Sequence, residues 1–141
     1  MRLTKFTDYA VRICLFLGMH QDRTVPIPEM AEAYGLSRNN LMKVAQRLAE
    51  GGFLRTERGR AGGVRLALPA SEIRLGQVVR HMEGEGSLVD CGGCPPDSGC
   101  GLARTFTEAR QAFYRTLDEV SLAEAAAAHA GAPAPKRAAC A

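Results

Sequence analysis

The sequence predicts a mainly α fold with a small β-hairpin, in one domain followed by a long helix toward the C-terminus. Apolar residues recur at three- and four-residue steps in most segments between residues 4 and 120, which is helical periodicity. In residues 64–68, the larger apolar side chains Val64, Leu66 and Leu68 alternate with Arg65 and Ala67, which is the periodicity of a strand. A chain of 141 residues buries the core of one domain without cross-links, so its five cysteines are not needed for ordinary stability.

The first helix is expected from Thr4 to Met19, with Thr4 as its N-cap. Its apolar face consists of residues that recur at helical spacing, namely Phe6, Tyr9, Ala10, Ile13, Cys14 and Leu17. Cys14 lies on this face and is expected to be a small buried residue.

Residues 28–50 are expected to form two helices joined by a tight turn at Gly35. Ser37 is expected to cap the second helix, whose inner face carries Leu41, Val44, Ala45 and Leu48. An alanine, Ala31, stands four residues before the turn glycine, and apolar residues stand six and nine after it. This spacing is typical of a DNA-binding helix-turn-helix.

The outer face of the second helix is polar and basic, and it carries Arg38, Asn39, Asn40, Lys43 and Arg47. Arginine and asparagine pair with guanine and adenine edges, and lysine suits phosphate. The candidate DNA contacts on this helix are therefore Ser37, Arg38, Asn39, Asn40 and Lys43. The alternative is an ordinary helical hairpin with a polar exterior.

A β-hairpin is expected directly after this helix, from residues 53–57 and 64–68, with a loop of arginine and glycine residues between them. A hairpin in this place is a wing, so residues 1–83 are predicted to form a winged helix-turn-helix DNA-binding domain. Arg58 and Arg60 in the loop are candidates for a minor-groove or phosphate contact. The alternative is an arginine-rich surface hairpin without a role in DNA binding.

Two further helices are predicted, over residues 75–83 and from residue 102 to about 120. The longer helix carries an apolar stripe of Leu102, Phe106, Ala109, Phe113, Leu117 and Val120. A domain of this size has little else to cover that stripe, so residues 102–129 are predicted to be a dimerisation helix region. Packing of the stripe against the winged domain of its own chain is the alternative. Residues 130–141 are low in complexity and predicted to be disordered.

Three cysteines, Cys91, Cys94 and Cys100, lie within ten residues in a loop predicted over residues 84–101. Glycine and proline let such a loop curl, so that several thiolates meet at one point. Thiolates suit iron–sulfur clusters, zinc or copper(I). An iron–sulfur cluster, a zinc site that adds His81, and a simple thiol switch remain open as interpretations.

The charge distribution favours a polyanionic partner such as DNA. Residues 1–65 have a net charge of +5, and residues 66–141 have a net charge of −2. The N-terminus shows no secretory signal and no run of about 18 apolar residues occurs, so a cytoplasmic location is expected, where clustered cysteines stay reduced. No convergent acid–base pair supports an enzyme.

In combination, three features over about residues 2–125 resemble the Rrf-two family of bacterial regulators. These are the first helix beginning Leu3-Thr4-Lys5-Phe6-Thr7-Asp8-Tyr9-Ala10, the wing loop Arg58-Gly59-Arg60-Ala61-Gly62-Gly63, and three cysteines ahead of a long helix. Within the family the chain is most similar to the NsrR group of nitric-oxide-sensing repressors. The resemblance implies a homodimer with one iron–sulfur cluster per subunit, [2Fe-2S] or [4Fe-4S], that binds a near-palindromic operator. It further implies that nitrosylation or loss of the cluster releases the DNA.

The resemblance also implies the ligands of the cluster. These are Cys91, Cys94 and Cys100, with Asp8 of the partner subunit as the fourth. Iron–sulfur-biogenesis regulators of the family instead use a histidine three residues after the third cysteine, where this chain has Ala103. Two residues separate Cys91 from Cys94, against four or five in most NsrR chains. A zinc-stabilised winged-helix repressor and a sensor of iron or cluster status are the alternative functions.

Overall fold

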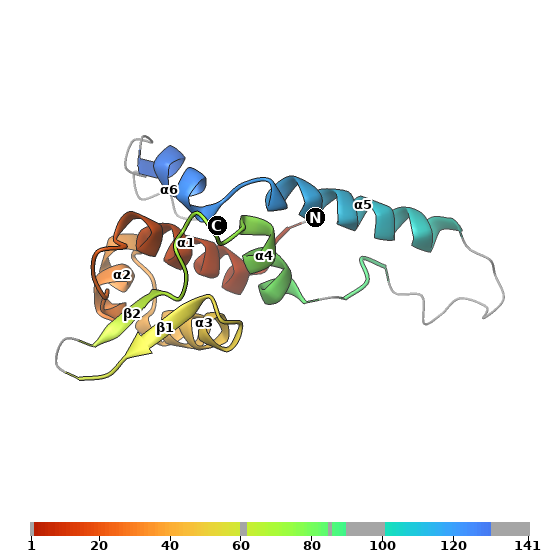
Figure 1. Ribbon diagram of the computed structural model, residues 1–141. Helices are drawn as coiled ribbons and strands as arrows, with labels where there is room; N and C mark the ends of the chain where they lie inside the picture. The colour runs from red at the N-terminus through yellow and green to blue at the C-terminus, as the bar shows by residue number, and fades with distance from the viewer. Residues whose placement is uncertain (1, 60–61, 85, 90–100, 131–141) are drawn as a thin grey trace.

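The computed structural model describes residues 2–59, 62–84, 86–89 and 101–130. In these residues the chain forms six helices and a two-stranded antiparallel hairpin (Figure 1). The elements in chain order are α1 (Lys5–Met19), α2 (Ile27–Tyr34), α3 (Arg38–Glu50), β1 (Leu54–Glu57), β2 (Gly63–Leu66), α4 (Leu75–Glu83), α5 (Gly101–Asp118) and α6 (Leu122–Ala130). The predicted mainly α fold with a β-hairpin wing is confirmed.

Helix α1 lies at the centre of the core, where it packs against α3, α4 and α6. Thr4 is its N-cap, since the Thr4 hydroxyl accepts a hydrogen bond from the Thr7 amide at 3.2 Å. The side chains of Ile13, Cys14 and Leu17 are buried, as their spacing predicts. Phe6 was expected on the same face but is 37% exposed. Phe6 lies in the first turn of α1 and is partly covered within the described structure.

Helices α2 and α3 form the predicted helix-turn-helix. Gly35 ends α2 with a φ of 64°, a left-handed conformation that glycine adopts without strain. The inner face of α3 is buried at all four predicted positions, Leu41, Val44, Ala45 and Leu48. Ser37 stands at the N-cap of α3, but its side chain makes no capping hydrogen bond, so the predicted side-chain cap is wrong.

The wing pairs β1 with β2, with Leu54 opposite Leu66 and Thr56 opposite Val64. Val64 also exchanges two backbone hydrogen bonds of 2.9 Å with Val25, which ties the wing to the segment before α2. Strand β2 ends at Leu66, and Leu68, predicted within the strand, is 49% exposed outside it. One further backbone hydrogen bond, from the Ala67 amide to the Phe53 carbonyl at 2.9 Å, extends the pairing past Leu66, and Pro69 follows two residues later without an N–H to donate.

Helix α6 begins with a capping box. The Ser121 hydroxyl accepts a hydrogen bond from the Glu124 amide at 3.2 Å, and the Glu124 carboxylate accepts one from the Ser121 amide at 2.8 Å. Leu122 and Ala126 are buried, and α6 packs against α1. Residues 102–129, predicted as one dimerisation region, are therefore divided between a long helix and a short one that joins the core.

The C-terminal end of α5 packs against α4. Asp118 forms an ion pair with Arg80 at 2.8 Å, and the Arg80 guanidinium lies 4.6 Å from the centre of the Tyr114 ring. Asp118 also lies so close to Gly76 that a Cβ atom at residue 76 would be 2.1 Å from Asp118 Oδ1. Only glycine at residue 76 allows this approach.

We predict that Gly76→Ala destabilises the fold by about 1–3 kcal/mol, because the added methyl group displaces Asp118 and breaks its ion pair. Urea unfolding followed by circular dichroism measures the change. Gly86→Ala is the matched control, since no atom lies within 4 Å of the corresponding Cβ position. Equal stability of the two variants would contradict the assigned role of Gly76.

Candidate nucleic-acid interface and its link to the cysteine segment

The outer face of α3 is open to solvent and carries unpaired cations. Ser37, Arg38, Asn39 and Lys43 are exposed, and Asn40 is half-buried. Neither Arg38 nor Lys43 forms an ion pair within the described part of the chain. The buried inner face of α3 and the turn at Gly35 hold the helix in place, so this face is presented on a rigid support.

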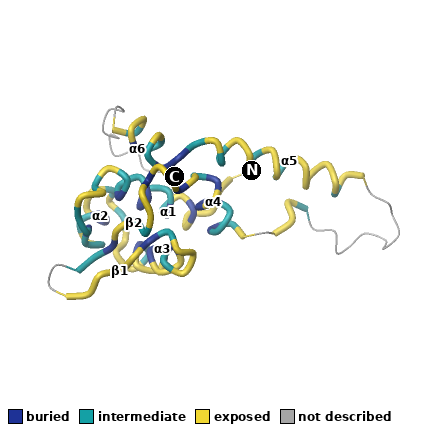
Figure 2. Tube along the Cα trace, in the orientation of Figure 1, coloured by how far each residue is buried: buried dark blue, intermediate teal, exposed yellow. Residues whose placement is uncertain are grey.

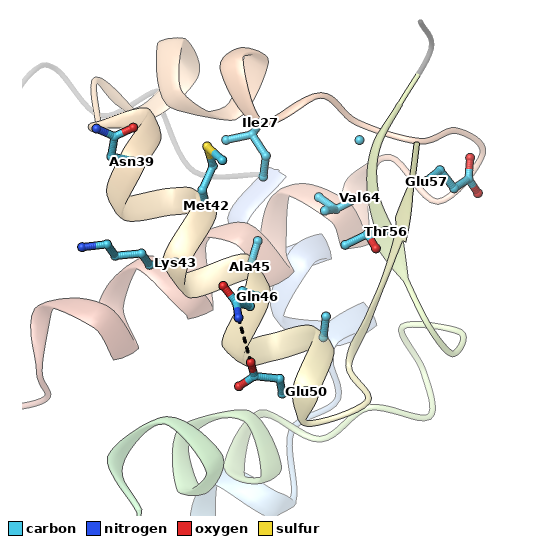
Figure 3. Close-up of a pocket in the computed structure, with 12 residues that line it drawn as sticks. Ile27, Asn39, Met42, Lys43, Ala45, Gln46, Glu50, Thr56, Glu57 and Val64 are labelled. Carbon is cyan, nitrogen blue, oxygen red and sulfur yellow. Dashed lines mark hydrogen bonds between the residues drawn. The ribbon is translucent and has the colours of Figure 1, made fainter. Parts of the chain in front are cut away.

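A groove of about 860 Å³ separates α3 from the wing (Figure 3). Its lining comes from α3, the wing and the start of α2, and consists of Ile27, Asn39, Met42, Lys43, Ala45, Gln46, Ala49, Glu50, Thr56, Glu57, Gly63 and Val64. Two predicted DNA contacts, Asn39 and Lys43, are among these residues. Met42 and Gln46 were not predicted, although they share the outer face with Asn39 at helical spacing, a signal already present in the sequence.

The wing places Arg58 at its tip, where the side chain is exposed. Arg60, the other predicted wing contact, lies outside the described residues. The helix-turn-helix and the wing therefore bring the predicted contacts Asn39 and Lys43 to one groove, with Arg58 at its wing side. Arg47, expected on the outer face of α3, is exposed and also donates a hydrogen bond to the Met82 carbonyl at 3.1 Å.

The last turn of α4 is bonded to both α1 and α3. The Glu83 carboxylate accepts hydrogen bonds from the Thr4 amide at 2.7 Å and from the Thr7 hydroxyl. His81 Nε2 donates to the Arg47 carbonyl at 2.7 Å, which adds to the bond from Arg47 to Met82. We call these contacts of residues 81–83 the α4 joint. After this joint the chain continues to residues 91–100, which contain Cys91, Cys94 and Cys100 and which we call the cysteine segment.

Hydrogen bonding sets the charge state of Glu83. Partial burial acts to raise the pKa of its carboxyl group, but the hydrogen bonds from Thr7 and Thr4, with the nearby charge of Arg47, outweigh burial and lower the pKa below its ordinary value. Glu83 is therefore a carboxylate that accepts from the first turn of α1.

Asp8 follows Thr7 in that same first turn of α1. Its side chain is half-exposed and forms an ion pair with Arg12 at 3.0 Å. Cys91, Cys94 and Cys100 lie outside the described residues, so the predicted cluster ligands stay a prediction. Within the described ranges no group of three or more histidine, cysteine, aspartate or glutamate residues is arranged to hold a metal ion.

Cys14 and His81 are engaged in the fold. Cys14 is fully buried, and burial raises the pKa of its thiol to about 12, which disfavours the thiolate that binds metals. The expectation of a small buried residue is confirmed. The Nε2 atom of His81, the candidate fourth ligand of a zinc site, is used by the carbonyl of Arg47.

The N-terminal part of α5 extends away from the helical body (Figure 1), and most of its surface is exposed (Figure 2). Leu102 is 58% exposed and Phe106 is 36% exposed, on the stripe predicted from the sequence. Within the described structure, Leu102 is therefore more than half uncovered and Phe106 about one third uncovered. On the flank of this stripe, Arg104 forms an ion pair with Glu108 at 2.8 Å.

The sequence profile of the Rrf2 family, described as an iron-dependent transcriptional regulator, matches residues 3–128. The chain belongs to the Rrf2 family. Members of this family are transcriptional regulators and not enzymes. Among the described residues, no helix of this Rrf2 protein is both long and apolar enough to cross a membrane.

Solved structures show the same winged-helix fold as this Rrf2 protein. CymR (YrzC), the global cysteine regulator of B. subtilis, has 22% identity and a TM-score of 0.77 over 91% of this chain and 98% of its own. Staphylococcus aureus CymR in its oxidized form has 26% identity and a TM-score of 0.72 over 89% and 96%. IscR of T. potens has 23% identity and a TM-score of 0.76 over 94% and 93%.

We predict that Glu83→Gln flattens the acid limb of the stability curve of this Rrf2 protein. The pKa of Glu83 in the folded state lies below the ordinary 4.5, so its carboxylate stabilises the fold at pH values above the unfolded-state pKa. This contribution is lost as the pH falls through the folded-state pKa. Urea unfolding of wild type and variant from about pH 7 down to about pH 3 tests this. Glu72→Gln, at an exposed carboxylate without an ion pair, should follow wild type.

Proposed function

We propose that this Rrf2 regulator is a homodimeric DNA-binding repressor whose operator affinity is set by an iron–sulfur cluster in each subunit. Cys91, Cys94 and Cys100 hold the cluster, with Asp8 of the partner subunit as the fourth ligand. The protein releases its near-palindromic operator when the cluster is nitrosylated or lost. The α4 joint is the observation that carries this proposal, because it bonds the turn before the cysteine segment to α1 and to the DNA-reading helix α3.

The chemistry of the proposed ligands suits an iron–sulfur cluster. Three thiolates are the usual ligands of iron–sulfur clusters, which bring an iron centre that reacts with nitric oxide. Asp8 has a half-exposed carboxylate in the first turn of α1, accessible to a partner chain. Figure 1 shows the start of α5 projecting away from the body that contains α1. Gly101, which follows Cys100 and begins α5, therefore lies away from α1 of its own chain. This arrangement favours Asp8 of the partner subunit as the fourth ligand.

Few contacts connect Asp8 on α1 with α3, the helix proposed to read the DNA. When Asp8 is held as a ligand, the first turn of α1 is fixed, and Thr4 and Thr7 of this turn hold Glu83. Release of Asp8 frees the turn. The change then reaches α3 through Met82 and His81, which are both hydrogen-bonded to Arg47. Dimeric readers need their recognition helices about 34 Å apart, so a shift of a few ångströms in each subunit is enough to weaken binding.

Exposed apolar residues on α5 support the homodimer. Burying the exposed parts of Leu102 and Phe106 against a second α5 contributes on the order of 1 kcal/mol for each side chain. The second copy also supplies Asp8, so the proposed metal site is complete only in the dimer.

A thiol-redox switch on the same cysteines is the second candidate function. The similarity to S. aureus CymR, whose solved structure is of an oxidized form, favours it. Such a protein would be colourless and would lose DNA affinity on oxidation instead of on exposure to nitric oxide.

We predict that the wild-type protein purified without oxygen is brown and absorbs visible light, and that Cys91→Ala abolishes this absorption because one thiolate ligand is lost. Asp8→Ala should keep the colour but make the cluster decay faster in air. Cys140→Ala is the matched control, at a cysteine outside the cysteine segment. A colourless wild type with one zinc per chain would support the zinc-stabilised repressor. A colourless wild type without zinc, whose DNA affinity depends on its thiols, would support the thiol switch.

We predict that Lys43→Ala and Arg58→Ala each weaken operator binding and lower the slope of log affinity against log salt by about one, because each removes a phosphate contact. Fluorescence anisotropy at several salt concentrations measures both effects. Arg104→Ala removes an arginine of α5 that is paired with Glu108, and it should leave the slope unchanged. If all three variants have the slope of wild type, the assignment of Lys43 and Arg58 is wrong.

A further inference from the structure

Met42 is a large apolar side chain in the middle of the otherwise polar outer face of α3. It is 58% exposed, although its neighbours on this face, Asn39, Lys43 and Gln46, are all polar. Leaving a methionine in water loses the free energy of burial, so nothing in the stability of the fold requires it here. A partner with an apolar group of its own would bury this side chain.

Met42 lines the groove between α3 and the wing, and in Figure 3 its side chain points toward Ile27 at the start of α2. The two side chains give the groove an apolar wall next to the amide of Asn39. The Glu57 carboxylate on the wing points away from the groove in Figure 3 and is paired with Arg65. Lys43 on the same lining offers a cation to the DNA backbone, whereas the apolar wall and the amide of Gln46 suit base edges.

Gln46 lies one helical turn after Met42 and has a fixed orientation. Its side-chain amide donates a hydrogen bond to Glu50 Oε1 at 3.0 Å. A carboxylate only accepts, so the Gln46 nitrogen faces Glu50. The Gln46 oxygen and the second N–H remain available, and these are the groups that pair bidentately with adenine.

We propose that Met42 is a specificity-determining residue that contacts the C5-methyl group of a thymine in the major groove, with Gln46, oriented by Glu50, on an adenine beside it. Among the bases only thymine offers a methyl group in the major groove, and apolar side chains read it. A helical turn advances about 5.4 Å and a base-pair step about 3.4 Å, so the two bases lie within about two base pairs. This inference rests on the proposed DNA-binding function and adds the base that α3 selects.

The test removes single methyl groups from the DNA. The half-site is first found by selection from random duplexes with the full-length protein, purified anaerobically. Each thymine is then replaced by deoxyuridine, which lacks only the C5-methyl group. At one thymine we expect wild type to lose affinity about fourfold, the effect of one buried methyl group. For Met42→Ala the same replacement should have no effect, and for Met42→Leu, which keeps an apolar contact, most of the effect should remain.

The matched control is Met19→Ala, at an exposed methionine of α1 outside the groove, and it should respond to deoxyuridine as wild type does. Because Met42 is exposed, Met42→Ala should fold, with unchanged circular dichroism and thermal midpoint. If no thymine-to-deoxyuridine replacement distinguishes wild type from Met42→Ala, the inference is wrong while DNA binding stands. If selection enriches no sequence and wild type binds no duplex, the proposed function itself fails.

Discussion

The contact on which the rest of the structure depends is the one between Glu83 and the first turn of α1. A single carboxylate accepts hydrogen bonds from the Thr4 amide and the Thr7 hydroxyl, and so fixes the start of the central helix against the end of α4. One residue earlier, the Met82 carbonyl accepts from Arg47 on α3. Three helices that are far apart in the sequence are thus joined within one turn, directly before the cysteine segment.

The DNA-reading surface owes its shape to contacts on its buried side. The wing is held to the core by the two hydrogen bonds between Val64 and Val25, and Gly63 is required there because a Cβ atom would lie 2.3 Å from the Val25 carbonyl oxygen. With the wing fixed in this way, a groove remains between it and α3. Its lining combines an apolar wall, the cation of Lys43 and the oriented amide of Gln46, so it offers groups both to base edges and to phosphate.

Local patterns predicted the fold well, and contacts between distant segments were harder to predict. Ala31, Gly35 and the buried face of α3 lie within about twenty residues, so spacing alone identified the helix-turn-helix. Helix α6 was missed because its alanine-rich sequence has little contrast between faces, although the Ser121–Glu124 capping box was visible. Met42 was overlooked because only the polar and basic side chains on the outer face of α3 were considered as DNA contacts. The assigned ligands Cys91, Cys94 and Cys100 stay a prediction, because only Asp8 of the set lies in the described residues.

Helix α4 links the two halves of the protein. Along its length, Gly76 in the first turn and Arg80 in the last turn contact Asp118 of α5, the helix proposed to form the dimer. At its end, Glu83 and Met82 bind α1 and α3. A displacement of either end must move α4 as a nine-residue rigid unit, because its interior side chains Val78 and Val79 are buried in a close-packed core. In the proposed function, a change at the cysteine segment and a change in the dimer therefore act on the same helix, and both reach the groove through Arg47.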